Sequence, residues 1–211
     1  MSSIFRWRPT IGWFTVWIGA SLLLPTLAVR GQEPDLVEAD PEAAKTAESH
    51  WVDQVRQITF GGLRAGEGYF SRDGGTMVFQ SERDPANPFY QIHLMDLANG
   101  DIQRISPGSG KTTCAWIHPD DNRVLFASTH HDPESVALQE KELEFRRSGQ
   151  QRRYAWDYDP AFELYEYDRA KREYRRLTEA RGYDAEGSYS PDGKTILFAS
   201  NREAFAREMS P

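Results

Sequence analysis

The chain contains a single cysteine, Cys114, among its 211 residues. One cysteine excludes an intrachain disulfide, so folding must rely on packing alone. We expect a small buried residue at this position, because unpaired structural cysteines are mostly buried. The sequence Gly-x-Ser-x-Gly is also absent, which removes the usual nucleophile turn of α/β-hydrolases.

Other patterns of catalytic or ligand-binding residues are incomplete. Residues 108–112 resemble the end of a phosphate-binding loop, but Ile105 stands where that motif needs a glycine. His130 and His131 could ligate a metal ion, yet adjacent residues of a strand point to opposite faces and no third ligand is placed by the spacing. The sequence therefore predicts no cofactor and no metal site.

Basic residues are outnumbered by acidic ones, which gives a net charge of −7. An acidic chain disfavours nonspecific binding to nucleic acid, so we expect no nucleic-acid partner. Hydrophobic residues make up 39% of the chain and aromatic residues 12%, which is enough to bury a core.

A turn followed by a strand is the dominant pattern. Pro191 presets an early turn dihedral, Asp192 can bond its own backbone two residues on, and Gly193 accepts a positive φ. The β-rich run 195–200 follows. Residues 69–83 and 116–130 align with residues 188–202 without a gap. The turn residues expected to be structural are Asp73, Gly74, Pro119, Asp120, Pro191, Asp192 and Gly193.

The flanks of this pattern repeat as well. The segments 90–106 and 162–178 align, and each is typical of two further strands joined by a turn. A four-stranded unit that recurs after 47 residues has the size of one β-propeller blade. The aligned aromatic or aliphatic positions are Phe70, Ile117 and Tyr189, and His118 takes the place of the turn serines Ser71 and Ser190.

These motifs resemble the TolB-type propeller repeat, a WD40-like repeat of the PD40 type, over about residues 55–202. The resemblance implies an all-β fold, a partial β-propeller of about two and a half four-stranded blades. We expect a closing strand at 55–59, a blade at 67–106, a blade at 115–178 and a partial blade at 187–201, within an incomplete propeller at 55–211. A closed propeller needs at least four blades, so the chain is expected to be a fragment of a longer propeller, or one of several chains that complete a ring.

The first 31 residues are typical of a signal peptide. Arg6 and Arg8 precede an uncharged, largely apolar stretch at 10–29, which predicts export to the periplasm or beyond. An uncleaved membrane anchor through residues 10–29 is the alternative. Residues 32–54 follow as an acidic linker with a short helix. Removal of Arg6, Arg8 and Arg30 would leave a net charge of −10.

An insertion at 131–159 interrupts the second blade. Its first part, 133–147, has helical character, with Val136, Leu138 and Leu143 between charged residues. Interleaved basic and aromatic residues then indicate a partner-binding loop, although a loop that only packs over the blade is an alternative. The candidate binding residues are Arg146, Arg147, Arg152, Arg153, Tyr154, Trp156 and Tyr158.

The acids of the turns recur at one position of every repeat, which is typical of turn caps rather than of a catalytic pair. The sequence therefore favours a noncatalytic exported scaffold that binds a protein or peptide. Two alternatives remain: the propeller of a serine hydrolase similar to prolyl oligopeptidase, with its catalytic domain missing, and a remnant that does not fold alone.

Overall fold

The computed structural model describes residues 48–153, 155 and 157–207. The signal or anchor at 1–31, most of the linker at 32–54, and Tyr154 and Trp156 lie outside the described residues. The chain divides into two compact units, Met1–Val55 and Arg56–Pro211, and every described strand belongs to the second. Within the described part, no helix is long and apolar enough to cross a membrane.

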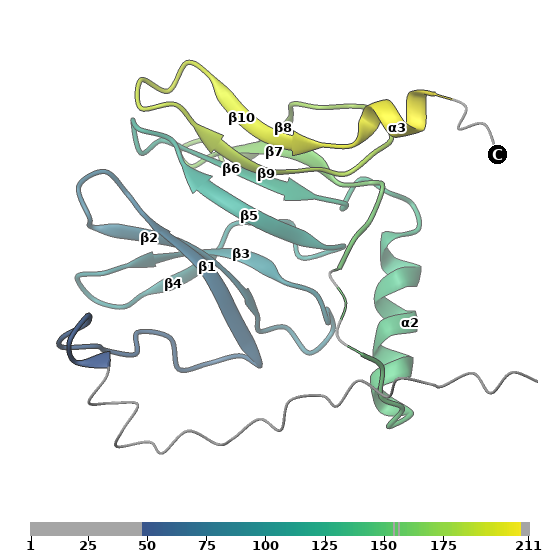
Figure 1. The fold of residues 1–211 in the computed structure, drawn as a ribbon, viewed down its shortest axis with the longest axis horizontal. Helices are drawn as coiled ribbons and strands as arrows, with labels where there is room; N and C mark the ends of the chain where they lie inside the picture. Colours follow the sequence, from purple (N-terminus) through teal and green to yellow (C-terminus); the bar gives the residue numbers. More distant parts are fainter. Residues whose placement is uncertain (1–47, 154, 156, 208–211) are drawn as a thin grey trace, which may run out of the picture. The chain divides into compact units, whose positions relative to one another are not determined.

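In the described part, ten strands form three antiparallel sheets (Figure 1). The first sheet has the order β1-β2-β3-β4, the second β5-β6-β7-β8, and the third pairs β9 with β10. Strands that are neighbours in sequence are neighbours in each sheet, the arrangement of a propeller blade. The strands are β1 (Arg64–Phe70), β2 (Thr76–Glu82), β3 (Gln91–Asp96), β4 (Ile102–Arg104), β5 (Thr112–Ile117), β6 (Arg123–Ser128), β7 (Glu163–Asp168), β8 (Glu173–Arg176), β9 (Asp184–Tyr189) and β10 (Ile196–Ser200).

The predicted all-β partial propeller is confirmed, with two four-stranded blades and the inner half of a third. The inner strands β1, β5 and β9 begin three residues before the expected blade starts at 67, 115 and 187. The expected closing strand at 55–59 is wrong. These residues have irregular backbone and pair with no strand in the described part.

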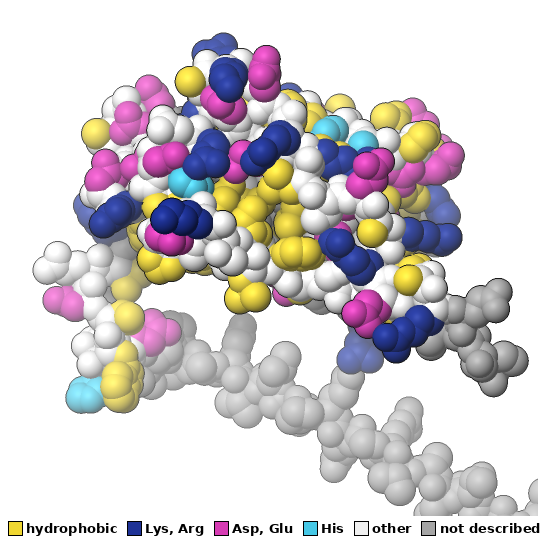
Figure 2. All heavy atoms as spheres, turned by 90° about the horizontal axis from the view of Figure 1, so that it is seen from above, with side chains coloured by type: hydrophobic (Ala, Val, Ile, Leu, Met, Phe, Trp, Pro, Cys, Tyr) yellow, Lys and Arg dark blue, Asp and Glu magenta, His cyan; other side chains and the backbone are white. Residues whose placement is uncertain are grey.

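The third sheet exposes apolar side chains on the side of β10. Seen from that side, apolar side chains occupy the middle of the face, with Lys, Arg, Asp and Glu side chains around them (Figure 2). Leu197 of β10 is 77% exposed, whereas Leu125, its counterpart in the second sheet, is fully buried. The difference arises because β6 is covered on both faces and β10 on one.

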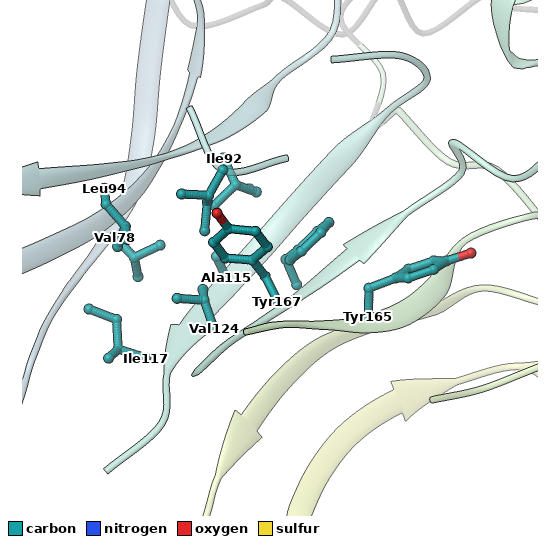
Figure 3. Close-up of a cluster of buried hydrophobic side chains, with 10 residues drawn as sticks. Val78, Ile92, Leu94, Ala115, Ile117, Val124, Tyr165 and Tyr167 are labelled. Atoms are coloured by element: carbon teal, nitrogen blue, oxygen red, sulfur yellow. The ribbon is translucent and has the colours of Figure 1, made fainter. Parts of the chain in front are cut away.

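The core lies between successive sheets, and β6 shows how the sequence builds it. Side chains along a strand alternate between its faces. Val124 and Phe126 therefore pack toward the first sheet, while Leu125 and Ala127 pack toward the third. Figure 3 shows the first of these clusters, which also contains Val78, Ile92, Leu94, Ile105, Ala115, Ile117, Tyr165 and Tyr167.

The insertion carries the helix α2 (Ser135–Arg147), and a short helix α3 (Arg202–Ala206) follows β10. The buried contact of α2 is polar: Gln139 Oε1 accepts the N–H of Gly110 at 2.5 Å, and Gln139 Nε2 donates to the carbonyl of Ala86 at 3.4 Å. Val136, expected on an apolar docking face, is 52% exposed. The helix packs on loop backbone, whose N–H and C=O groups need hydrogen-bond partners rather than apolar contacts.

Candidate functional site

Each inner strand contains a β-bulge at the same position of the repeat. Glu67, Cys114 and Glu186 have positive φ angles of 47°, 53° and 57°. The pairing register of each strand with its neighbour shifts around them. Because L-residues pay about 1 kcal/mol or more for this conformation, its recurrence in three strands is a built feature of the repeat. A bulge re-aims the side chain at its position.

The three bulge residues line one shared hollow of about 420 Å³, here called the axial hollow. The inner strands β1, β5 and β9 lie next to one another, so the hollow runs along the inner edge of all three sheets. Two aromatic rings also line it: Tyr69 and Trp116 have ring centroids 4.6 Å apart with their planes tilted by 45°. The other lining residues are Ala115, Gly187 and Ser188.

The axial hollow is negative. Burial, together with the carboxylates of Glu67 and Glu186, raises the pKa of the Cys114 thiol to about 12, so the thiol is neutral at pH 7. Burial, together with Glu67, also raises the pKa of Tyr69. No Lys or Arg lines the hollow among the described residues. Two acids beside exposed aromatic faces form a surface that attracts a cation.

The insertion residues predicted to bind a partner are divided by the structure. Arg146 pairs with Glu82 at 2.6 Å and with Glu142 at 2.9 Å, and it donates to the carbonyl of Pro88 at 2.8 Å. Arg152 pairs with Glu142 at 2.7 Å and lies over the Phe145 ring at 4.6 Å. Arg146 therefore ties the insertion to the first sheet, whereas Arg152 joins two parts of the insertion itself.

The remaining insertion candidates are more accessible. Arg147 and Arg153 are exposed, and neither forms an ion pair within the described residues. Tyr158 is 45% exposed, stacks on Tyr183 at 5.7 Å, and its hydroxyl accepts a hydrogen bond from Asn201 at 3.0 Å. Tyr158 and Arg152 line a hollow of about 430 Å³ beside α2, whereas Arg147 and Arg153 are exposed groups outside it.

The turn acids bond their own turns. Asp73 Oδ1 accepts the N–H of Gly75 at 2.9 Å, and Asp192 Oδ1 accepts the N–H of Lys194 at 3.1 Å. Asp120 does the same for Asn122 at 2.9 Å. The hydroxyls of Ser71 and Ser190, together with these backbone bonds, lower the pKa values of Asp73 and Asp192, as expected for carboxylates stabilised by hydrogen-bond donors. The turn acids do not line the axial hollow.

Both rings of the histidine pair lie beside Tyr165. The rings of His130 and Tyr165 have centroids 4.3 Å apart with planes tilted by 51°, and burial lowers the pKa of His130 to about 4. Within the described ranges, no group of three or more His, Cys, Asp or Glu side chains is arranged to hold a metal ion. Residues 108–112 run from the loop after β4 into β5, where the amide of Gly110 is bonded by Gln139.

Reasoning from the sequence missed the axial hollow. Glu67, Cys114 and Glu186 stand three residues before Phe70, Ile117 and Tyr189, so the repeat alignment already superposes them. The available signal was two acids and a thiol at one position of three strands that are otherwise expected to be buried. That signal indicates a site only if the strands bulge there, and a single sequence does not reliably reveal a bulge.

The strand order within each sheet, the sheet-on-sheet cores and the repeated inner bulges define a partial β-propeller. No family model matches the chain, and no curated protein matches it. Solved structures do show similarity to the chain. Two of them are TolB proteins, whose propeller repeat is the one that this sequence resembles.

TolB from Acinetobacter baumannii is 27% identical, with 68% of this chain and 28% of that chain covered and a TM-score of 0.46. A TolB structure from Agrobacterium tumefaciens is 20% identical, with 69% and 41% covered and a TM-score of 0.48. The β-propeller domain of the Trilobed protease from Pyrococcus furiosus is 14% identical, with 66% and 35% covered and a TM-score of 0.42. The chain thus spans less than half the length of each of these three proteins.

Proposed function

We propose that this chain is a noncatalytic propeller scaffold that binds a protein or peptide partner, and that the axial hollow receives a positively charged side chain of that partner. The observation that carries the proposal is the convergence of Glu67, Cys114 and Glu186, three equivalent bulge residues, on one hollow. The basic and apolar start of the sequence supports export as the setting in which this binding takes place.

The chemistry of the hollow favours a lysine. Two carboxylates without a basic neighbour among the lining residues attract a cation, and each gains from a charge-assisted hydrogen bond. The faces of Tyr69 and Trp116 add a cation–π contribution of about 0.5–1 kcal/mol at a site open to solvent. The neutral thiol of Cys114 contributes no competing charge.

The same residues support a noncatalytic role. The two carboxylates occupy equivalent positions in β1 and β9, on either side of β5, and the hollow contains no histidine, serine nucleophile with a base, or metal ligand set among its described lining residues. A binding role needs only charge and shape, both of which the hollow supplies.

The test is a binding titration with the full chain. The probe is an amino-terminally acetylated, carboxy-amidated Gly-Lys-Gly peptide, and the comparison probe is the same peptide with the lysine side chain acetylated. The signals of the Trp116 indole and the Cys114 amide report binding by NMR. We expect the charged peptide to bind with a Kd on the order of 1 mM, as few contacts allow, and the acetylated peptide to bind at least tenfold more weakly.

The double variant Glu67→Gln with Glu186→Gln should weaken binding of the charged peptide at least tenfold. The matched control is Glu140→Gln with Glu144→Gln, which removes the same charge from the exposed face of α2 and should leave binding within twofold. Equal binding of both peptides, or equal loss in both double variants, refutes the axial site. Cleavage of the peptide during the titration refutes the noncatalytic role.

A further inference from the structure

A second hollow, of about 440 Å³, lies in the second sheet beside the insertion, and we call it the corner hollow. It is lined by the two ends of the insertion, at residues 131–133 and 159–161, by Glu163 at the start of β7, by Arg176 at the end of β8, and by residues 179–181 of the loop after β8. Its charged groups are the acids Asp132, Asp159, Glu163 and Glu179 and the bases Arg176 and Arg181, so acids outnumber bases. The first sheet has an equivalent corner, at a distance of 72 residues in the repeat. The two corners differ in the chemistry of two side chains.

In the first sheet, amide side chains close the corner. Gln91 Oε1 accepts the N–H of Gly108 at 3.1 Å, and Gln91 Nε2 donates to the carbonyl of Gly110 at 3.0 Å. Asn87 Nδ2 donates to the carbonyls of Gly108, at 3.1 Å, and Gly110, at 3.0 Å. Every polar atom of this buried glutamine amide therefore has a partner within the corner.

In the second sheet, acids take both amide positions: Asp159 replaces Asn87, and Glu163 replaces Gln91. Glu163 Oε1 accepts the N–H of Ala180 at 2.8 Å, the counterpart of the bond from Gly108 to Gln91. Glu163 Oε2 takes the place of the amide nitrogen and has no hydrogen-bond partner among the described residues, although Glu163 is only 2% exposed. A carboxylate cannot donate to the loop as the amide does.

The chain satisfies one of these two acids itself. Lys111 Nζ lies 3.2 Å from Asp159 Oδ2 and donates to the carbonyl of Tyr158 at 3.3 Å. Arg176 pairs with the other oxygen of Glu163, at 3.0 Å, and no described residue donates to Oε2. A buried anionic oxygen without a donor destabilises the fold, so a donor that reaches it is bound favourably.

A second unpartnered atom lines the same hollow. His131 Nδ1 is buried and has no hydrogen-bond partner in the described part of the chain. Burial lowers the pKa of His131, with a further contribution from Arg176, so the ring is neutral at pH 7. With its proton on Nε2, the ring presents Nδ1 as an acceptor. The hollow thus offers two acceptors that lack a donor.

We propose that the corner hollow binds a small molecule through a primary ammonium group, which donates to Glu163 Oε2 and to His131 Nδ1. An ammonium is compact and carries three donors, and it supplies the positive charge that Glu163 lacks on this side. Lys111 on Asp159 is the same interaction, made within the chain at the neighbouring acid. The corner hollow shares no lining residue with the axial hollow, so the two proposals can fail separately.

The first experiment uses the full wild-type chain and needs no variant. Methylammonium is titrated by NMR against the backbone N–H of Ala180, which bonds Glu163 directly. Tetramethylammonium is the comparison, because it has the same charge and no N–H donor. With two non-hydrogen atoms, methylammonium can reach a Kd on the order of 10 mM at best. We expect a saturable shift with methylammonium and none with tetramethylammonium at equal ionic strength.

The second experiment uses Glu163→Gln, which gives the second sheet the amide of the first. The new amide can donate to its loop as Gln91 does, so we expect folding to be retained and methylammonium binding to fall at least tenfold. The matched control is Glu179→Gln, because Glu179 also lines the hollow but its side chain is 86% exposed; it should bind within twofold of wild type.

The outcomes that overturn the proposal are specific. If methylammonium gives no saturable shift, the corner hollow holds ordered water only. If tetramethylammonium shifts Ala180 equally, the effect is general electrostatics rather than a donor site. If Glu163→Gln folds and still binds, the ammonium is elsewhere; if it fails to fold, the comparison of the two cations on the wild-type chain decides.

Discussion

The Nε2 atom of His118 lies 3.1 Å from the carbonyl oxygen of Gly193, and this contact joins the turn of the second sheet to the turn of the third. The imidazole also meets the Tyr189 ring edge-on, with centroids 4.6 Å apart and planes at 80°. The residue that replaces a turn serine in the repeat thus makes a bridge between successive sheets. A change in either turn at this position should therefore also change the packing between the two sheets.

A methyl group at Gly193 should break this bridge. Gly193 has a φ of +70°, and a Cβ there would lie 2.6 Å from His118 Cε1. We expect Gly193→Ala to lower the free energy of unfolding by about 1 kcal/mol for the left-handed backbone and by about 1–2 kcal/mol more for the displaced ring. Urea denaturation followed by circular dichroism measures both contributions together.

The chain provides the control for that measurement. Gly74 occupies the same turn position in the first sheet with a φ of +73°, and a Cβ there meets no atom within 4 Å. Gly74→Ala therefore reports the backbone contribution alone. Equal losses in the two variants would show that the His118 contact does not stabilise the third sheet.

Adjacent arginines of the insertion should differ sharply in their effect on stability. Arg146 pairs with the buried Glu82 and with Glu142, whereas Arg147 has no ion pair in the described part. We expect Arg146→Ala to cost about 2–3 kcal/mol, because it leaves Glu82 with Arg64 alone. Arg147→Ala should stay within about 0.5 kcal/mol.

Hydrogen exchange locates the effect of Arg146→Ala. Amides of α2 should exchange faster in this variant while those of β6 stay protected, because the lost pairs hold the insertion rather than the sheet. Uniform loss of protection across both elements would mean that the insertion and the sheets unfold as one unit. Unchanged exchange in α2 would contradict the role given to Arg146.

Acid should destabilise the protein through His93. Burial lowers the pKa of His93 from 6.5 to about 4, against its hydrogen bond to the carbonyl of Gln91, and the side chain is 5% exposed. Between these values the unfolded chain binds a proton that the folded chain does not. The stabilisation, about 3 kcal/mol, is therefore complete above pH 6.5 and is lost as the pH falls from 6.5 toward 4.

His93→Gln isolates this contribution. Gln remains neutral throughout and can donate to the same carbonyl, so its unfolding free energy should depend less on pH between 7 and 4.5 than that of the wild type. His130, whose pKa is also lowered to about 4, titrates in both proteins and cancels from the comparison. Parallel pH profiles would show that His93 is protonated in the folded state.

The sequence predicted the fold because the repeat encodes it locally. The turn of Pro191, Asp192 and Gly193 and the alternation on β6 are each set by neighbours along the chain. The ion pair that fixes the insertion was not predicted, because it joins Arg146 to Glu82, 64 residues away, and no local pattern pairs them. The unpartnered Oε2 of Glu163 could not be predicted either, because it depends on which residues of the fold reach each corner.

Cys114 should be unreactive in the folded protein although it lines the axial hollow. Its pKa of about 12 leaves about one thiol in ten thousand ionised at pH 8, and the thiolate is the reactive form. We expect a disulfide reagent such as DTNB to react at least a hundredfold more slowly with the native chain than with the chain in urea. Glu67→Gln should speed the native reaction, because the carboxylate of Glu67 opposes the thiolate, whereas Glu140→Gln on α2 should not.

A native rate equal to the rate in urea would place the thiol in solvent and remove Cys114 from the hollow. If Glu67→Gln reacts at the wild-type rate, the carboxylate of Glu67 does not act on the thiol. That result would contradict the convergence of the bulge residues on which the axial site depends.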